Sequence, residues 1–276
     1  MAAIAKPQQR PGTIESHSRA VERVIDAMND RLEDSFTLDQ MASIAIMSRF
    51  HFNRTFRRVT GIPPRHFLGA LRLQAARRLL VTTSASVTDV CFSVGYNSLG
   101  TFIRRFTGLL GVSPRRLRLL ASQQGALADT MVSSPTAGQF RREISGRIEA
   151  PADFQGLVFI GLFRSPLPQE VPVACAIVSA PGVFRMRAPH GTFHLFSLAI
   201  PATADPSRYF LYDSALRAGG QSIRVTADGV SGSTELRLRA PLPTDPPILL
   251  AMPVLLKRAA RATSPPLAQQ ESRPSA

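Results

Sequence analysis

The chain has 276 residues, 44% of them hydrophobic, and a formal net charge of +14 at pH 7. This length predicts about two domains with apolar cores of their own. No stretch approaches the roughly 18 uninterrupted apolar residues of a membrane span, and the start of the chain lacks the apolar centre of a signal peptide. We therefore expect a cytoplasmic protein. Cys91 and Cys175 lack zinc-ligand spacing, so we interpret both as small buried residues and predict no metal.

The chain opens with a basic, Pro- and Gln-rich leader, residues 1–15, which we expect to be disordered. From Ser16 to Arg31 the apolar residues recur at helical spacing, namely Val21, Val24, Ile25 and Met28. This pattern predicts an amphipathic helix that packs on the segment after it.

Residues 37–118 contain one short pattern twice. Thr37 with Gln40, and Ser86 with Asp89, are typical of a capping box at the start of a helix. Each pair is followed by one apolar stripe at helical spacing: Leu38, Met41, Ala42 and Ala45 in the first copy, and Val87, Val90, Cys91 and Val94 in the second. Ser48 and Ser98 then begin a second helix, whose inward residues are Phe52, Phe56 and Val59, or Phe102, Phe106 and Leu109. Each copy is therefore predicted to be two short helices joined by a turn.

The outward face of each second helix has the chemistry to contact DNA. The first copy presents Phe50, Asn53, Arg54 and Arg57 there, and the second presents Leu99, Gly100, Ile103, Arg104 and Thr107. A major groove admits one helix, and Arg or Asn pairs bidentately with guanine or adenine edges. For a single helix, outward arginines more often only solvate an amphipathic surface. The repeat and the charge favour the DNA interpretation.

Positive charge is concentrated in this repeat. Between Arg49 and Arg118 there are thirteen arginines, no lysine and one acidic residue, Asp89, which gives a formal charge of +12. Such a concentration indicates a polyanionic partner, because each neutralised phosphate releases counterions. A membrane surface would attract the same charge, but the apolar residues are arranged for packing between helices. We predict double-stranded DNA as the partner and no membrane contact.

A longer helix is predicted between the two copies, from about Arg65 to Val81, after Pro63-Pro64. Its inner side is expected to hold Phe67, Leu68, Leu71, Ala75 and Leu79. Because it is continuous, it would act as a stiff spacer of about 1.5 Å per residue.

This segment resembles the double helix-turn-helix DNA-binding domain of the AraC/XylS family of transcription regulators. The stretches that carry the resemblance are Ala75-Ala76-Arg77-Arg78-Leu79-Leu80, Ser86-Val87-Thr88-Asp89-Val90, Val94-Gly95-Tyr96-Asn97-Ser98, Phe102-Ile103-Arg104-Arg105-Phe106 and Gly111-Val112-Ser113-Pro114. The resemblance implies two recognition helices, beginning at Ser48 and Ser98. The residues expected to face bases are Phe50, Asn53, Arg54, Leu99, Gly100, Ile103 and Arg104. Those expected to hold the DNA backbone are Ser48, Arg49, Arg57, Arg58, Ser98, Thr101 and Arg105.

The chain departs from that family in three ways. Leu99 and Gly100 stand where polar residues are frequent, so base reading by the second helix would rest mainly on Arg104, with apolar contacts to thymine from Leu99 and Ile103. Ile46 stands where the second copy has Gly95; either it is strained there, or the first turn has a different geometry. The DNA-binding segment also comes first, whereas in most members a sensing domain precedes it.

After a predicted linker, residues 121–139, the pattern changes to short apolar runs with Pro/Gly turns. The expected strands are Arg147 to Glu149, Leu157 to Phe163, Val171 to Ala180, Val183 to Arg187, Thr192 to Ile200, Ser222 to Thr226 and Glu235 to Ala240, with Ile248 to Leu256 as a last strand or a strap. Gly219-Gly220 is one of the expected turns between them. These runs predict an antiparallel β-sandwich over residues 140–260, followed by a disordered tail, residues 261–276.

The fold class is thus α + β in two domains: an all-α double helix-turn-helix domain at residues 16–120, then an all-β antiparallel sandwich. The sandwich weakly resembles transthyretin-like and carboxypeptidase-regulatory-like domains. Its polar candidates are His190, His194, Tyr209, Tyr212 and Asp213, but no third metal ligand lies at a useful interval. Ser197 and Ser222 have no nucleophile-elbow context, so we expect neither an enzyme nor a cofactor. An effector pocket within the sandwich and a dimerisation surface both stay open.

The predicted function is a bacterial, sequence-specific regulator of transcription associated with the nucleoid. RNA polymerase and a small-molecule effector of the C-terminal domain are considered as further partners. One alternative is a nonspecific nucleic-acid- or RNA-binding protein, which would need exposed aromatic residues for stacking on bases; only Phe50 is expected to be one. Another alternative is a ligand-binding sandwich that the basic half merely anchors to DNA.

Overall fold

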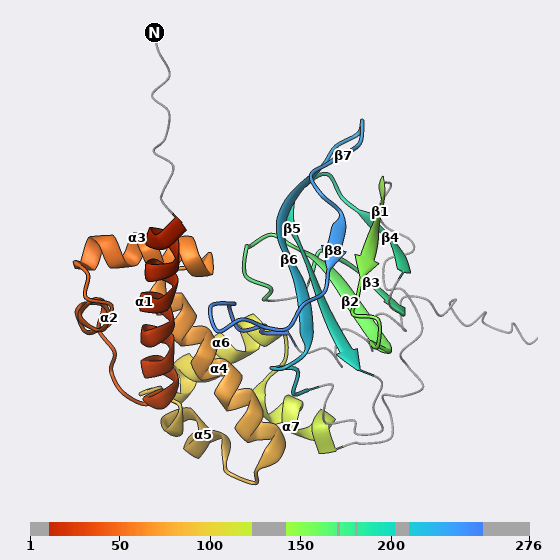
Figure 1. Cartoon of the computed structure of the whole chain (residues 1–276). Coiled ribbons are helices and arrows are strands. Elements are labelled where there is room, and N and C mark those ends of the chain that lie inside the picture. The colour runs from red at the N-terminus through yellow and green to blue at the C-terminus, as the bar shows by residue number, and fades with distance from the viewer. Residues whose placement is uncertain (1–10, 123–141, 170–171, 180–181, 202–209, 251–276) are drawn as a thin grey trace, which may run out of the picture.

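The computed structural model describes residues 11–122, 142–169, 172–179, 182–201 and 210–250. In Figure 1 the helices lie together on one side and the two β-sheets on the other, with the segment after the last strand passing back to the helices. Most of the predicted leader and linker, and the whole predicted tail, lie outside the described residues, as do Tyr209 and residues 251–256 of the predicted last strand.

The helical part contains seven helices within its described residues. They are α1 Pro11–Asp30, α2 Leu38–Ile44, α3 Arg49–Thr60, α4 Pro64–Thr82, α5 Val87–Ser93, α6 Leu99–Leu110 and α7 Pro114–Ser122. α1 begins within the stretch predicted to be a disordered leader, because a proline at a first helical position is already held at a helical φ angle. α7 was not predicted from periodicity. Its start mirrors that of α4, with Pro114 in the place of Pro64.

The same caps shape both helix-turn-helix units, as the repeat predicted. Thr37 with Gln40 and Ser86 with Asp89 each form a complete capping box. The Ser48 hydroxyl accepts a hydrogen bond from the His51 amide, and the Ser98 hydroxyl accepts one from the Thr101 amide. Both second helices end on a left-handed glycine, Gly61 and Gly111. The predicted repeat is confirmed as one structural unit used twice.

The turn inside each unit needs a left-handed residue. Gly95 has a φ angle of 79° in the second unit, and Ile46 has a φ angle of 56° at the matching place in the first. The suggestion that the first turn has a different geometry is therefore wrong, and the suggestion of strain is confirmed. A β-branched residue is costly in this region, since its Cβ approaches the backbone closely.

α4 supplies part of the core to both units. Phe67, Leu68 and Leu71 pack with the first unit, while Leu73, Ala76 and Leu80 pack with the second. The predicted inner residues Ala75 and Leu79 are only half-buried. The predicted inner side is confirmed, because Phe67, Leu68 and Leu71 are buried and Ala75 and Leu79 pack against the core of the second unit. Neighbours also cover α4 on further sides and bury even Arg77.

The C-terminal part is a two-layer β-sandwich. Its strands are β1 Arg142–Glu149, β2 Gly156–Phe163, β3 Ala174–Ser179, β4 Gly182–Ala188, β5 Gly191–Pro201, β6 Leu216–Val225, β7 Val230–Ser231 and β8 Glu235–Arg237. One sheet has the order β4-β1-β8 and the other has the order β3-β2-β5-β6-β7. All pairs are antiparallel except β1 with β8, so the predicted wholly antiparallel arrangement needs one correction. Because β1 and β8 are far apart in the chain and no hairpin joins them, β8 can run parallel to β1.

Two predicted details of the strands change. β6 begins at Leu216, well before the predicted Ser222, and Gly219-Gly220 lies inside it instead of forming a turn. The ladder shifts register opposite this pair, between Leu195 and Phe196. A Cβ on Gly219 would lie 2.4 Å from the Leu195 carbonyl oxygen and 2.6 Å from the Phe196 Cα, so the close approach of the strands at this bulge requires glycine.

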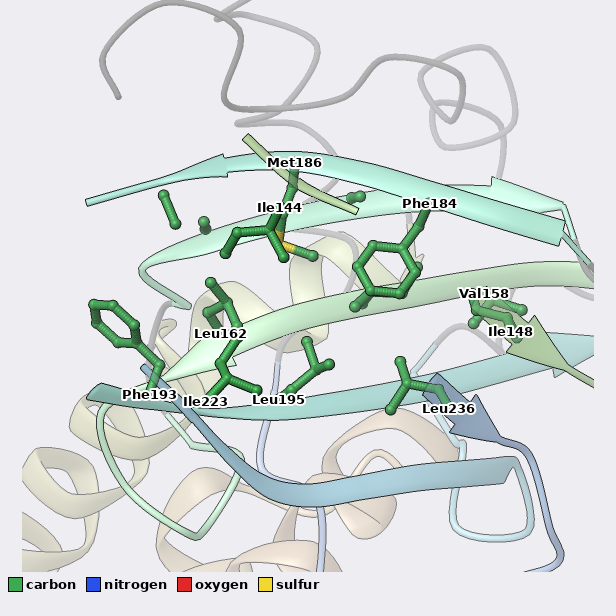
Figure 2. Close-up of a cluster of buried hydrophobic side chains, with 14 of the residues drawn as sticks. Ile144, Ile148, Val158, Leu162, Phe184, Met186, Phe193, Leu195, Ile223 and Leu236 are labelled. Carbon is green, nitrogen blue, oxygen red and sulfur yellow. The ribbon is translucent and has the colours of Figure 1, made fainter. Parts of the chain in front are cut away.

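The core between the two sheets is apolar. Figure 2 shows Ile144, Phe184 and Met186 on one layer facing Leu162, Leu195 and Ile223 on the other. The other face of the five-stranded sheet is covered by a second cluster that includes Phe159, Tyr212, Ile248 and Leu250. The segments that carry these last residues also contact the helical part, so they join the two domains.

Candidate nucleic-acid interface

The outward faces of α3 and α6 hold every residue predicted to face bases. Phe50 is 78% exposed, and Asn53 and Arg54 follow it one turn later on the same exposed surface of α3. On α6, Gly100, Ile103 and Arg104 are exposed, while Leu99 is half-buried against the core of the second unit. Leu99 has therefore less surface left for a thymine methyl group than the sequence suggested.

The predicted backbone contacts surround these faces. Ser48 and Ser98 cap the two helices, and Arg57, Arg58 and Arg105 are exposed. Thr101 is half-buried. Arg49 lies 5.2 Å from the centroid of the Phe50 ring and 3.8 Å from the Asp39 carboxylate, so this arginine partly covers the one exposed aromatic ring on α3.

The helix α4 lies between the two helix-turn-helix units in the chain and packs with both. Its 19 residues form one uninterrupted helix. At 1.5 Å per residue this is a rod of about 28 Å, close to the roughly 34 Å of one turn of B-DNA. The length of α4 is thus comparable with the spacing of neighbouring major grooves on one side of a duplex.

Three of the thirteen arginines between Arg49 and Arg118 stabilise the fold through contacts of their side chains with other parts of the protein. The Arg72 guanidinium donates to the carbonyl oxygens of Leu32 and Asp34, at 2.8 and 2.7 Å. Arg118 donates to the carbonyl oxygens of Leu80 and Ala85. Arg77 is 1% exposed. A charge count from sequence includes all three, because it does not distinguish an arginine that satisfies buried carbonyls from one that faces solvent.

Two further groups near α3 and α6 were not predicted. The His17 ring of α1 lies 5.4 Å from the His51 ring, and partial burial, together with His51 and Arg58, lowers the pKa of His17. Tyr96, just before α6, is 8% exposed, and burial raises its pKa although Arg105 and Arg72 partly oppose this. Neither position has a periodic signal, so only the packing of distant elements identifies them.

The predicted polar candidates of the sandwich do not form one site. His190 is exposed and precedes β5, whereas His194 lies within β5 with a buried Nδ1 that has no hydrogen-bond partner among the described residues. Ser197 is buried and donates to the Ala218 carbonyl oxygen at 3.4 Å. Across the described ranges, no group of three or more His, Cys, Asp or Glu side chains is arranged to hold a metal ion.

Tyr212 and Asp213 contact the helical domain instead. The buried Arg77 guanidinium of α4 pairs with the Asp213 carboxylate, lies 4.2 Å from the centroid of the Tyr212 ring, and donates to the Ile248 carbonyl oxygen at 2.9 Å. Burial raises the pKa of Tyr212, with Arg77 opposing the rise. The hydroxyl of Tyr212 in turn accepts a hydrogen bond from the Leu250 amide at 3.2 Å. This contact attaches the sandwich to the helix between the two units.

None of the helices in the described residues is long and apolar enough to cross a membrane. Both cysteines are buried, as predicted, and burial raises the pKa of each thiol, for Cys175 to about 12.

Comparisons with known proteins concern the helical domain. Residues 41–119 match the family model described as a helix-turn-helix domain. The bifunctional transcriptional activator/DNA repair enzyme AdaA of Bacillus subtilis is 26% identical over 107 residues, 39% of this chain and 51% of the relative. The HTH-type transcriptional activator AarP of Providencia stuartii is 28% identical over 102 residues, 37% of this chain and 76% of the relative. The chain thus spans about half the length of AdaA.

A solved structure is similar to this chain over a comparable share of its length. The DNA-binding domain of AdpA, described as a global transcriptional factor in complex with a target DNA, is 31% identical; the match covers 39% of this chain and 98% of that one, with a TM-score of 0.37. Residues 41–119 match a helix-turn-helix domain, and the relatives named above are described as transcriptional activators, in agreement with the helix-turn-helix resemblance predicted from the sequence.

Proposed function

We propose that this protein is a sequence-specific DNA-binding regulator of transcription, which inserts α3 and α6 into successive major grooves. The observation that carries the proposal is the pairing of two identically capped helices with outward polar or basic faces, one in each helix-turn-helix unit, with the uninterrupted helix α4 between the units in the chain. The names of the relatives, most of which are transcriptional regulators, support it. Acting on chromosomal DNA, the protein would work in the cytoplasm, at the nucleoid.

Within this proposal the residues divide into two roles. Asn53, Arg54 and Arg104 hydrogen-bond base edges, with apolar contacts from Ile103, and Arg57, Arg58 and Arg105 hold phosphates. No catalytic step or metal is part of this function. RNA polymerase is the further partner that this function implies.

Selection of bound sites from a random duplex library tests the proposal. We expect enrichment of a site with two conserved blocks about one helical turn apart. With the selected duplex, Arg54→Ala should cost about 1–3 kcal/mol of binding free energy and relax preference at one base position. Arg105→Ala should weaken binding to all sequences alike and reduce the salt dependence.

Arg187→Ala is the matched control, because it removes an exposed arginine from the outer strand β4. We expect it to leave both affinity and preference unchanged. Failure to enrich any sequence near physiological salt would refute specific recognition. Uniform loss of affinity from Arg54→Ala, without a change in preference, would instead favour the nonspecific nucleic-acid-binding alternative.

A further inference from the structure

The two helix-turn-helix units have separate apolar cores. The core of the first unit combines residues of α1, α2 and α3 with one part of α4, and the core of the second combines residues of α5, α6 and α7 with another part of α4. Among the described residues no side chain of α1–α3 belongs to the second core, and none of α5–α7 belongs to the first. Apolar packing therefore joins each unit to α4 without joining the units to one another.

Arg72 of α4 makes a polar contact with the first unit. Its Nε donates to the Leu32 carbonyl oxygen at 2.8 Å, and its Nη2 donates to the Asp34 carbonyl oxygen at 2.7 Å. Both acceptors lie in the segment between α1 and α2. Burial lowers the pKa of the Arg72 guanidinium, and in the described part of the chain this group is paired with no carboxylate. The two carbonyl oxygens therefore replace the water that the guanidinium has lost.

The same guanidinium lies against the turn of the second unit. A Cβ on Gly95 would lie 2.8 Å from the Arg72 Nη2 and 2.5 Å from the Leu32 carbonyl oxygen. The backbone of the first unit, the Arg72 side chain and the backbone of the second unit thus meet at one point, three residues before Ser98, which caps α6. Together Leu32, Asp34, Arg72 and Gly95 form an inter-unit junction.

The first unit shows that this close contact is particular to the second turn. Ile46 occupies the matching turn with the same left-handed backbone, so a positive φ angle alone does not exclude a side chain there. The Ile46 side chain is 85% exposed, whereas any side chain at Gly95 would collide with the first unit and with Arg72. Glycine at position 95 therefore serves the contact between the units as well as the turn.

We propose that Arg72 is a positioning residue, which fixes the orientation of α6 relative to α3 through the inter-unit junction. It thereby sets the spacing between the two blocks of base pairs that the protein accepts. This role rests on the proposed function, because only a protein that reads two blocks has a preferred spacing. One added base pair moves a block by about 3.4 Å along the duplex and turns it by about 35°, so a small pivot between the units changes which spacing fits.

Binding of the full chain to three duplexes, followed by fluorescence anisotropy, tests this role. The duplexes are the site enriched from the library and two versions with one base pair added or removed between the blocks. For the unaltered chain we expect each altered spacing to weaken binding by at least about tenfold, because both units cannot then contact their blocks at once. For Arg72→Met, which removes the donors, we expect a loss of about threefold or less, because the units can pivot. Equal spacing preference in the two proteins would overturn the proposal.

Gly95→Ala attacks the same junction from the second unit. The added Cβ pushes the turn away from Leu32 and Arg72, so this variant should also tolerate the altered spacings. A spacing preference as strong as that of the unaltered chain would show that contact at this point does not orient α6, and would refute the junction.

Arg118→Met is the matched control for Arg72→Met. Arg118 also donates to two backbone carbonyl oxygens, those of Leu80 and Ala85, but both acceptors lie on the second unit's own side of the molecule. Its loss should lower the urea midpoint of unfolding, as the loss of Arg72 does, and should leave the spacing preference unchanged. A relaxed preference in Arg118→Met as well would show that any loss of stability has this effect, and would refute a specific role for Arg72.

Distance measurements without DNA separate this proposal from the proposed function. Spin labels are attached to Arg57→Cys on α3 and Thr107→Cys on α6, two exposed and matching positions, while both native cysteines are buried. We expect Arg72→Met to broaden the distribution of distances between the labels, and Arg118→Met to leave it unchanged. If selection enriches no sequence, the proposed function fails and the distance distribution still decides the junction. A distribution of unchanged width in Arg72→Met would refute the junction whatever the DNA result.

Discussion

The two helix-turn-helix units have the same internal frame and different surroundings. In both, the two inward phenylalanines of the second helix have ring centroids 5.5 Å apart, Phe52 with Phe56 and Phe102 with Phe106. α1 completes the core of the first unit, with Leu167 as the one buried residue from the sandwich. The core of the second unit is completed by Phe210 and Leu249 of the sandwich. The internal packing is therefore the same in both units, but different parts of the chain complete the two cores.

Their exposed faces differ as well. α3 presents Asn53 and Arg54, whose side chains have the groups to hydrogen-bond base edges, whereas α6 presents Gly100 and Ile103 beside Arg104. The comparison shows that core packing restricts the residue types only at the inward-facing positions of a repeated unit. We infer that the first unit carries more of the base discrimination, while the second is the unit whose stability depends on the sandwich.

Asp213→Ala should have the largest effect, and it tests the dependence of the second unit on the sandwich. Arg77 would remain buried at 1% exposure without its carboxylate partner. We expect a loss of about 3 kcal/mol in the free energy of unfolding, measured by urea denaturation. Amide exchange should accelerate in α5 and α6 more than in α2 and α3.

Asp153→Ala is the control for that change, since Asp153 is an exposed aspartate of the sandwich outside the contact with α4. It should alter stability by no more than about 0.5 kcal/mol. Equal acceleration of exchange in both units would show that the sandwich does not support the second unit selectively.

Gly95→Ala should have the next largest effect, because the second turn is crowded where the first is open. A Cβ at position 95 would lie 2.5 Å from the Leu32 carbonyl oxygen and 2.8 Å from an Arg72 nitrogen. Together with the left-handed φ angle, this should cost about 2 kcal/mol of unfolding free energy. A urea midpoint equal to that of the unaltered chain would mean that the turn relaxes freely.

Ile46→Gly should have the smallest effect and the opposite sign. Ile46 is 85% exposed, so its removal loses little packing, while glycine relieves the left-handed strain. We expect a gain of up to about 1 kcal/mol, reduced by the entropy of glycine in the unfolded chain. Ile46→Ala, which keeps a Cβ, should be nearly neutral. A loss of stability in Ile46→Gly would show that the Ile46 side chain makes a stabilising contact although most of its surface is exposed.

Local pattern was sufficient to predict both units, their caps and the outward faces of α3 and α6. Capping boxes and helical periodicities depend on residues three and four apart, and the pattern of each unit is confirmed by its twin. The same reasoning found most strands, since apolar runs between Pro/Gly turns are also local. It failed at Gly219-Gly220, because this pair lies at a bulge inside β6 and glycine is favoured in bulges as it is in turns.

The roles of Arg77, Tyr212 and Asp213 follow from contacts between residues far apart in the chain. By sequence alone Arg77 is one more surface charge, yet in the folded molecule it is buried beside Tyr212 and Asp213 of the sandwich. Burial is a property of the assembled molecule, because the atoms that exclude water from a side chain come from elements that neither its neighbours nor its periodicity specify.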